Sequence, residues 1–178
     1  MKTIIKVALM AIAYFATFIL GASCGIIHPA CYAYVGAILP LITAFIYLYT
    51  CRQIKGFGAA TILNGFVLVV FLIAGEADTP CIIGMVGLTA IAEALRRFKG
   101  IRWSFVPFAF SFFTYISHWW FDTEGSLAAA VEEMPEGYDQ LMLPVINNIP
   151  VLIVVLILTI PVAILAMHLA EKTLKKSA

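Results

Sequence analysis

Two histidines, several aromatic residues and two asparagines are the side chains of this sequence best suited to hold a ligand. Each stands near an end of an apolar run, on what we expect to be one side of a membrane. Imidazole binds iron, and aromatic side chains pack against flat ligands. We therefore expect a site for a flat aromatic or metal-bearing molecule. Its expected residues are His28, His118, Tyr115, Trp119, Tyr32, Asn147 and Asn148, with His28 and His118 as metal ligands.

The same residues also have simpler explanations. Trp119 stands where the interfacial aromatic belt of a membrane protein is expected, and His118 fits there as an ordinary polar residue. Cys24 and Cys31 are compatible with a disulfide, a metal site or two inert thiols, and we favour inert thiols. No CxxC spacing occurs, which argues against a zinc ribbon or a thioredoxin-like site.

The apolar segments lack the residues that pumps, ion channels and several classes of enzyme require. They hold almost no ionisable groups, whereas proton-coupled pumps and ion channels usually carry such groups at mid-depth. The sequence has no HExxH or Walker motif. We expect no enzyme activity, no catalytic residues and no intrinsic cofactor. An integral membrane enzyme acting on lipid is the alternative from another functional class.

The composition predicts that the elements carrying these residues lie in a membrane. Of the 178 residues, 63% are hydrophobic and 12% are charged, whereas soluble proteins are roughly half apolar and about a quarter charged. Backbone groups in lipid must pair within their own segment, so we expect an all-α integral membrane protein. Residues 1–178 are expected to form a single transmembrane domain. The net charge of +1, without a basic patch, gives no indication of nucleic-acid binding.

Six apolar runs are candidates for membrane-spanning helices, because about 20 apolar residues cross a bilayer. They cover residues 4–22, 30–49, 57–74, 81–95, 103–121 and 141–170. With six spans, all 11 Lys and Arg residues fall on one side, which the positive-inside rule makes cytoplasmic. We therefore predict a bundle of six transmembrane helices in a bacterial plasma membrane, with both termini in the cytoplasm.

The first apolar run carries a stripe of small residues. Ala13, Thr17 and Gly21 follow one another at intervals of four. Small residues at this spacing allow two helices to approach closely. The stripe is explained either by packing within the bundle or by docking against another membrane subunit.

Three further patterns predict local contacts. Asn64, in the middle of an apolar run, is expected to form an interhelical hydrogen bond. Glu93 precedes Arg96 and Arg97 at helical spacing, which favours a local ion pair. Ser126 is expected to cap a short helix in the acidic segment 122–140. A solvated acidic loop is the equally acceptable alternative there.

Taken together, the chain resembles the substrate-binding S components of energy-coupling factor (ECF) ABC importers, and among them the Trep-Strep family. The resemblance rests on the chain length, the six-helix layout and the stripe of the first helix. It also rests on the stretch from Lys55-Gly56-Phe57-Gly58-Ala59 through Gly75, and on residues 87–94. Where S components carry an AxxxA-like pattern, this chain has Ala13-x3-Thr17-x3-Gly21.

The resemblance implies a specific division of labour. An S component captures a small molecule outside the cell, in a site formed by the outer halves of helices 4 to 6 under the loop after helix 1. A membrane T component and two cytoplasmic ATPases drive uptake, with Ala13, Thr17 and Gly21 at the partner interface. Some Trep-Strep-like proteins are associated with haem uptake, so haem is the leading ligand. A vitamin or another metal chelate is the alternative.

Overall fold

The structure is a computed structural model and describes residues 2–176. This part of the chain consists of helices joined by short connections. No strand occurs in this range. The elements are α1 (Lys2–Ser23), η1 (Cys24–Ile26), α2 (Pro29–Tyr34), η2 (Val35–Ala37), α3 (Pro40–Gln53), α4 (Ala59–Ala74), α5 (Thr79–Lys99), α6 (Ile101–Phe108), α7 (Ser111–Tyr115), α8 (His118–Phe121), α9 (Thr123–Glu133), α10 (Tyr138–Ile146) and α11 (Ile149–Lys176).

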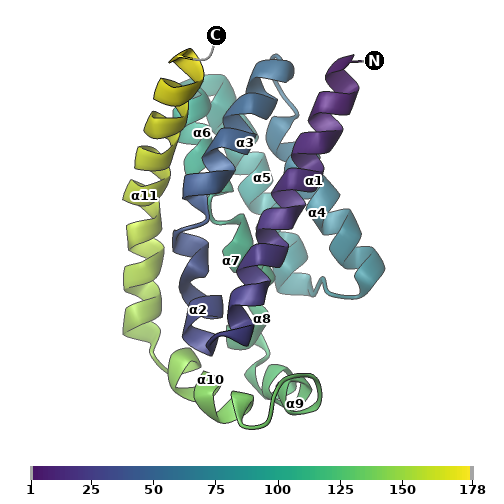
Figure 1. Cartoon of the computed structure of the whole chain (residues 1–178), viewed down its shortest axis with the longest axis vertical. Coiled ribbons are helices and arrows are strands. Elements are labelled where there is room, and N and C mark those ends of the chain that lie inside the picture. Colours follow the sequence, from purple (N-terminus) through teal and green to yellow (C-terminus); the bar gives the residue numbers. More distant parts are fainter. Residues whose placement is uncertain (1, 177–178) are drawn as a thin grey trace.

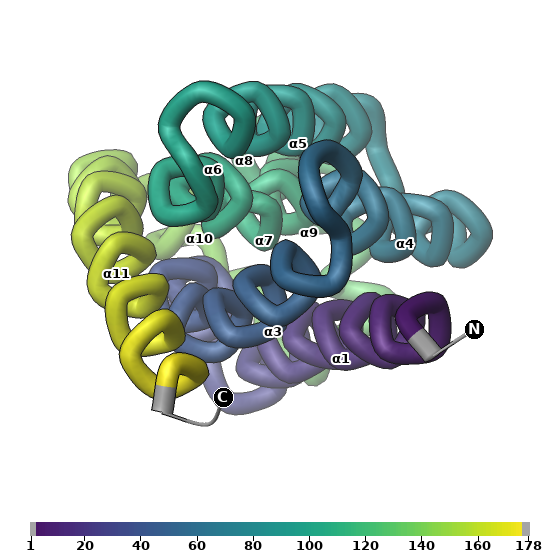
Figure 2. The backbone as a smooth tube through the Cα atoms, turned by 90° about the horizontal axis from the view of Figure 1, so that it is seen from above, coloured from purple at the N-terminus to yellow at the C-terminus, as the bar shows by residue number. Residues whose placement is uncertain are grey.

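The helices form a bundle with chemically different ends. Figure 1 shows the start of α1 and the end of α11 at one end, and α9 and α10 at the other. At the first end, Arg52 donates to the Leu174 carbonyl over 3.2 Å, and Arg102 pairs with Glu171 over 2.5 Å. We call this the basic end. The opposite end, where α9 and α10 carry Glu124, Glu132, Glu133 and Asp139, we call the acidic end. In Figure 2, α7 lies inside the ring of longer helices, and its Ser111 is fully buried.

Helix length and composition identify fewer spans than six. Residues Thr3–Ile26 and Ile149–Lys175 each form a helix that is long and apolar enough to cross a membrane. The pair Pro29–Ala37 and Pro40–Gln53, bent by 42°, is a third span if it is counted as one. With 16 residues, α4 is about 24 Å long, shorter than a hydrocarbon layer of about 30 Å. The fold class is therefore all-helical with clear apolar spans, and these criteria alone do not establish the number six.

The structure divides the helix predicted over residues 103–121 into α6, α7 and α8. The prediction of one continuous helix is therefore wrong. Ser111, Thr114 and Ser117 each donate a side-chain hydrogen bond to the carbonyl three residues earlier, over 2.7–2.8 Å. Such bonds compete with the helical N–H donors for the same carbonyl oxygens. Pro107 removes another backbone donor. The segment therefore breaks twice and places α7 in the interior.

The segments predicted over residues 30–49 and 141–170 are also divided. Within residues 30–49, α2 and η2 end first, and a new helix, α3, begins at Pro40. Within the second, α10 ends at Ile146 and α11 starts after Asn148, whose Oδ1 accepts the Val151 amide over 3.3 Å. A side-chain cap followed by Pro150 in the first turn is a typical helix start. The long helix expected there is thus two helices joined at a corner.

The short helix expected in the acidic segment exists as α9, but its cap is different. The Asp122 side chain accepts from the Gly125 amide over 3.2 Å and caps the helix. The Ser126 hydroxyl instead contacts His118. Since the carboxylate precedes the helix, it is better placed than Ser126 to bind the first free N–H groups.

Asn64 joins four helices in the interior, which confirms the predicted interhelical bond. Its Oδ1 accepts from the Tyr14 hydroxyl of α1 over 2.9 Å. Its Nδ2 donates to Thr89 of α5 over 2.8 Å and to Ser111 of α7 over 3.0 Å. The side chain is 1% exposed. Because the amide is cut off from water, these bonds fix the relative positions of α1, α4, α5 and α7.

Two charged residues of α5 hold the corner between α3 and α4. Glu93 Oε1 accepts from the Thr61 amide in the first turn of α4 over 3.1 Å. Arg96 Nη2 donates to the carbonyls of Cys51 and Ile54 at the end of α3. A carboxylate at a helix start and a guanidinium at a helix end complement the two helix dipoles. The local Glu93–Arg96 ion pair expected from the sequence is therefore wrong, since both groups bind backbone of neighbouring helices.

We predict that Asn64→Ala lowers the free energy of unfolding by about 1–3 kcal/mol, because the buried Tyr14 hydroxyl loses its acceptor. Tyr14→Phe should cost less, about 0.6 kcal/mol, the average for a hydrogen bond between membrane helices. Reversible unfolding in mixed micelles measures both effects.

Because the two residues share one bond, the double variant should lose less than the sum of the single losses. Tyr34→Phe is the matched control, since its hydroxyl makes only a 3.5 Å contact with the Val145 carbonyl. Strictly additive losses for Asn64 and Tyr14 would show that the bond between them carries no energy.

Candidate ligand-binding site

Four aromatic side chains with polar tips meet at the acidic end. Tyr32 comes from α2, Tyr115 from α7, Trp119 from α8 and Tyr138 from α10. The Trp119 and Tyr138 rings are 6.5 Å apart, and the Tyr32 hydroxyl lies near Tyr115, Trp119 and Tyr138. All but the half-buried Tyr115 are buried. We call these four residues the aromatic cluster.

Two polar atoms of the aromatic cluster have no hydrogen-bond partner within the described residues. They are the indole nitrogen of Trp119, which lies near the Tyr32 hydroxyl without a well-aligned hydrogen bond to it, and the hydroxyl of Tyr138; both are buried. A buried donor left unpaired costs about 1–3 kcal/mol, and such groups are rare enough to require a reason. Both atoms are hydrogen-bond donors whose capacity is unused within the described residues.

The corner between α1 and α2 closes directly over the aromatic cluster. A Cβ atom at Gly25 of η1 would lie 3.3 Å from the Tyr138 hydroxyl and 3.5 Å from Tyr32. An alanine there would require the Tyr138 hydroxyl to shift by only a few tenths of an ångström, so the backbone lies in near contact with both side chains. The next two residues, Ile26 and Ile27, are 81% and 78% exposed. The corner is therefore a thin roof, in the place where the sequence predicted a loop over the ligand.

The structure places His28 outside this cluster. Its side chain is exposed, and its Nδ1 accepts from the Ala30 amide over 3.1 Å as the cap of α2. In a neutral imidazole whose Nδ1 accepts, the proton is on Nε2. Neither nitrogen then has a free lone pair for a metal. His28 has a local reason to be where it is, which the sequence did not reveal.

His118 lies beside the aromatic cluster on its other side. Its Nδ1 is 2.8 Å from the Ser126 hydroxyl, and its ring lies against Trp119 at a centroid distance of 5.1 Å. It lines a cavity of about 470 Å³ together with Asp78 and Asp122. His28 does not line this cavity. Within the described residues, no group of three or more His, Cys, Asp or Glu is arranged to hold a metal ion.

The two asparagines predicted for the site lie at the corner between α10 and α11. Both side chains are exposed. Asn147 ends α10, and Asn148 caps α11. Their surroundings are those of helix-end residues. Trp120, which the sequence did not assign to the site, donates its indole N–H to the neighbouring Ile146 carbonyl over 3.3 Å.

The small residues of α1 pack largely within the bundle. Thr17 is 3% exposed, and its hydroxyl donates to the Tyr14 carbonyl over 2.6 Å. A Cβ at Gly21 would lie 2.5 Å from the Phe112 ring, while Ala13 is half-buried. This geometry corresponds to the packing explanation of the stripe.

All four cysteines, Cys24, Cys31, Cys51 and Cys81, are free thiols in this structure.

Tyr138 is the member of the aromatic cluster that the sequence analysis missed. It lies in the acidic segment between the last two predicted spans, where side-chain direction has no periodic signal. Only the fold of α10 under the α1–α2 corner brings it to Trp119.

Comparison with known proteins assigns the chain to a family. A family model described as "hypothetical bacterial integral membrane protein (Trep_Strep)" matches residues 1–177. No curated protein and no solved structure matches the chain. The apolar helices and the aromatic cluster near the end of the bundle are thus features of a chain that belongs to the Trep_Strep family of bacterial integral membrane proteins.

Proposed function

We propose that this protein is the substrate-capturing membrane subunit, or S component, of an ECF-type ABC importer. The observation that carries the proposal is the aromatic cluster, with two buried donors that lack acceptors beneath a thin roof. A ligand that supplies acceptors removes the cost of both donors. Closure of the roof over such a ligand would isolate it from water, as a high-affinity capture protein requires.

The proposed topology has six membrane passes and cytoplasmic termini in the bacterial plasma membrane. It is supported by the position of both termini at the basic end and by the positive-inside rule. The shorter and broken segments are acceptable in such a bundle where other helices cover them, because irregular backbone is tolerated when protein buries it. The acidic end, with the aromatic cluster, would then face outside.

The proposed partners are a membrane T component and two cytoplasmic ATPases, as the resemblance to S components implies. The chain has no Walker motif of its own, which fits a subunit that relies on separate ATPases. The outward side of α1 offers a docking face, since Ile5, Leu9 and Ile12 are each more than half exposed. The half-buried Ala13 lies next to this face.

The ligand class that the donors favour is a small aromatic molecule with acceptor atoms, such as a vitamin. Haem is the second candidate, and the open cavity beside His118 favours it. A neutral imidazole can supply one axial ligand to haem iron. We propose His118 as the axial ligand of the haem iron. His28 is not proposed as the second axial ligand, because its side chain caps α2.

The topology gives a direct prediction. In a variant whose native cysteines are replaced, a single cysteine at Glu132 should react with an impermeant thiol reagent added to intact cells, because α9 would lie outside. A cysteine at Lys99 should react only after the cells are opened. Both positions are exposed, so accessibility in the folded protein is matched. Labelling of the Lys99 position from outside would refute the proposed orientation.

The ligand site predicts opposite effects on stability and binding. Tyr138→Phe removes a donor that is unpaired in the free protein and keeps the ring, so the ligand-free variant should lose little stability or gain some. It should weaken ligand binding by about two- to twelve-fold, the value of one hydrogen bond. Trp119→Phe should weaken binding in the same way, but it also removes buried ring atoms and should therefore lower the stability of the free protein. Thermal unfolding and ligand titration, with the ligand identified by mass spectrometry of the purified protein, measure the two effects.

Trp120→Phe is the matched control, because its indole N–H already has a partner in Ile146. It should destabilise the free protein and leave binding unchanged. Equal binding losses in Trp119→Phe and Trp120→Phe would remove the two unpaired donors from the site.

Haem is distinguished from other ligands by its absorption spectrum. If haem is the ligand, the purified protein should show a Soret band that shifts in His118→Ala and is retained in His28→Ala. An unchanged spectrum in His118→Ala would exclude this histidine as axial ligand. A vitamin found in place of haem would refute the haem proposal and leave the capture role standing.

A further inference from the structure

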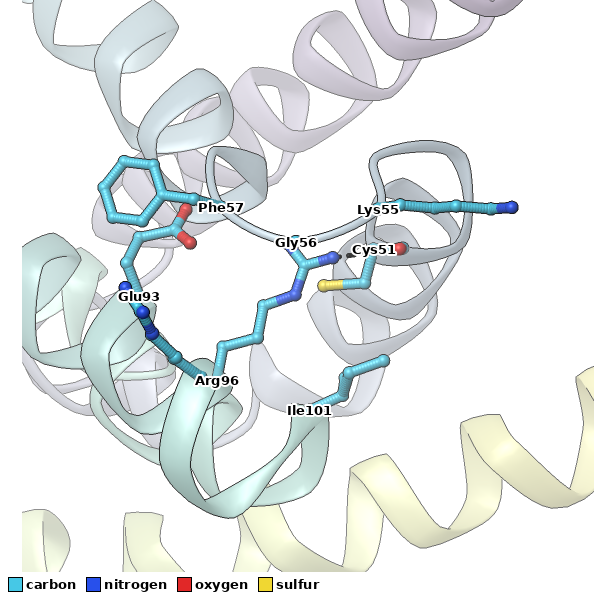
Figure 3. A pocket seen from close by; sticks show the side chains of 8 residues that line it. Cys51, Lys55, Gly56, Phe57, Glu93, Arg96 and Ile101 are labelled. Atoms are coloured by element: carbon cyan, nitrogen blue, oxygen red, sulfur yellow. Dashed lines mark hydrogen bonds between the residues drawn. The ribbon is translucent and has the colours of Figure 1, made fainter.

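A second cavity lies at the basic end, far from the aromatic cluster in the fold. It has a volume of about 610 Å³ and lies between the α3–α4 connection and the α5–α6 corner. Figure 3 shows Glu93 and Arg96 on its α5 side, facing the connection that carries Lys55, Gly56 and Phe57. Arg97 also lines the cavity. We call it the basic-end cavity.

Its wall holds two polar atoms with opposite requirements. Glu93 is 2% exposed; its Oε1 is bonded to Thr61, while its Oε2 has no partner within the described residues. Arg96 Nη2 donates hydrogen bonds to carbonyls at the end of α3, whereas the buried Nη1 has no hydrogen-bond partner within the described residues. A ligand that fits both must accept a hydrogen bond at Arg96 and donate one at Glu93.

An apolar groove leads away from this cavity. The groove has a volume of about 280 Å³, lies between α4 and α5, and shares Phe57 and Glu93 with the basic-end cavity. It continues past Gly65 and Leu68 toward mid-bundle, and almost all of its lining is apolar. A Cβ at Gly65 would meet no atom within 4 Å. A cavity whose mainly apolar wall carries Glu93 and Arg96, beside an apolar groove, has room for a lipid headgroup and a chain.

We infer that the basic-end cavity and its groove bind an anionic phospholipid of the phosphatidylglycerol type. Its phosphodiester accepts from Arg96 Nη1, and a glycerol hydroxyl donates to Glu93 Oε2. One acyl chain lies in the groove beside Gly65. Basic pockets between helices at a membrane surface are suited to such headgroups. The inference does not depend on the proposed transport function.

Net charge selects an anion over a zwitterion. Lys55, Arg96 and Arg97 line the cavity with positive charge, and Glu93 is its acidic residue. Phosphatidylethanolamine also offers a donor and a phosphate, but its headgroup carries no net charge. Phosphatidylglycerol keeps a negative charge and supplies hydroxyl donors that Glu93 does not repel. Free glycerophosphoglycerol has the same phosphodiester and hydroxyl groups and no acyl chain to occupy the groove.

The test uses the full chain in nanodiscs and compares phosphatidylglycerol with phosphatidylethanolamine. Native mass spectrometry measures the lipid retained on the released protein. We expect selective retention of phosphatidylglycerol. Arg97→Gln should weaken this binding about five-fold, the effect of one basic residue near a headgroup. Gly65→Leu should weaken it by filling the groove, without a clash in the fold.

Matched controls separate the site from general effects. Lys99→Gln removes a basic residue of the same helix end that does not line the cavity. Gly87→Leu adds the same side chain to α5 where the space is also open. Both controls should bind phosphatidylglycerol like the unmodified protein. Equal retention of the two lipids, or equal losses in Gly65→Leu and Gly87→Leu, would overturn the inference. If free glycerophosphoglycerol in detergent raised the unfolding temperature as much as phosphatidylglycerol does, the inference would also be overturned, because the groove would then contribute nothing.

Discussion

The amide of Asn64 is the interaction on which the arrangement of the bundle depends. It binds Tyr14, Thr89 and Ser111 at once, and so fixes α1, α5 and α7 around α4. Apolar packing alone does not specify how helices are rotated in lipid, because lipid chains are as apolar as the side chains. A buried amide has definite directions for its bonds. It therefore selects one arrangement, with α7 in the interior between the two ends of the molecule.

The two ends then use the same bundle for different chemistry. At the acidic end, Tyr32 and Tyr138 lie against the roof around Gly25, and Trp119 of α8 packs beside Tyr138. At the basic end, α5 presents Glu93 and Arg96 to the corner between α3 and α4. Each end leaves buried polar atoms unpaired. In a chain with so few polar groups inside, these atoms are the strongest indication of where molecules from the surroundings bind.

The proposed functions of the two ends are physically independent. The aromatic cluster offers two hydrogen-bond donors between ring faces, which suits a small ligand captured from one side of the membrane. The basic-end cavity offers a donor, an acceptor and an apolar groove, which suits a lipid that is part of the membrane itself. Asn64 lines that groove as well as holding the bundle. A chain bound beside it would therefore lie against the residue that positions α7.

The sequence alone determined the membrane class, the helical content, the separation of charges and the interhelical role of Asn64, because these follow from composition and from continuous apolar runs. The sequence also predicted Tyr32, Tyr115 and Trp119 as members of one candidate site. Only the tertiary structure decided where the helices break, that Tyr138 joins the aromatic cluster and that His28 caps α2. These outcomes depend on contacts between distant segments, such as Gly25 with Tyr138. Local periodicity reports which face of a segment is buried, and it carries no information about which distant side chain meets that face.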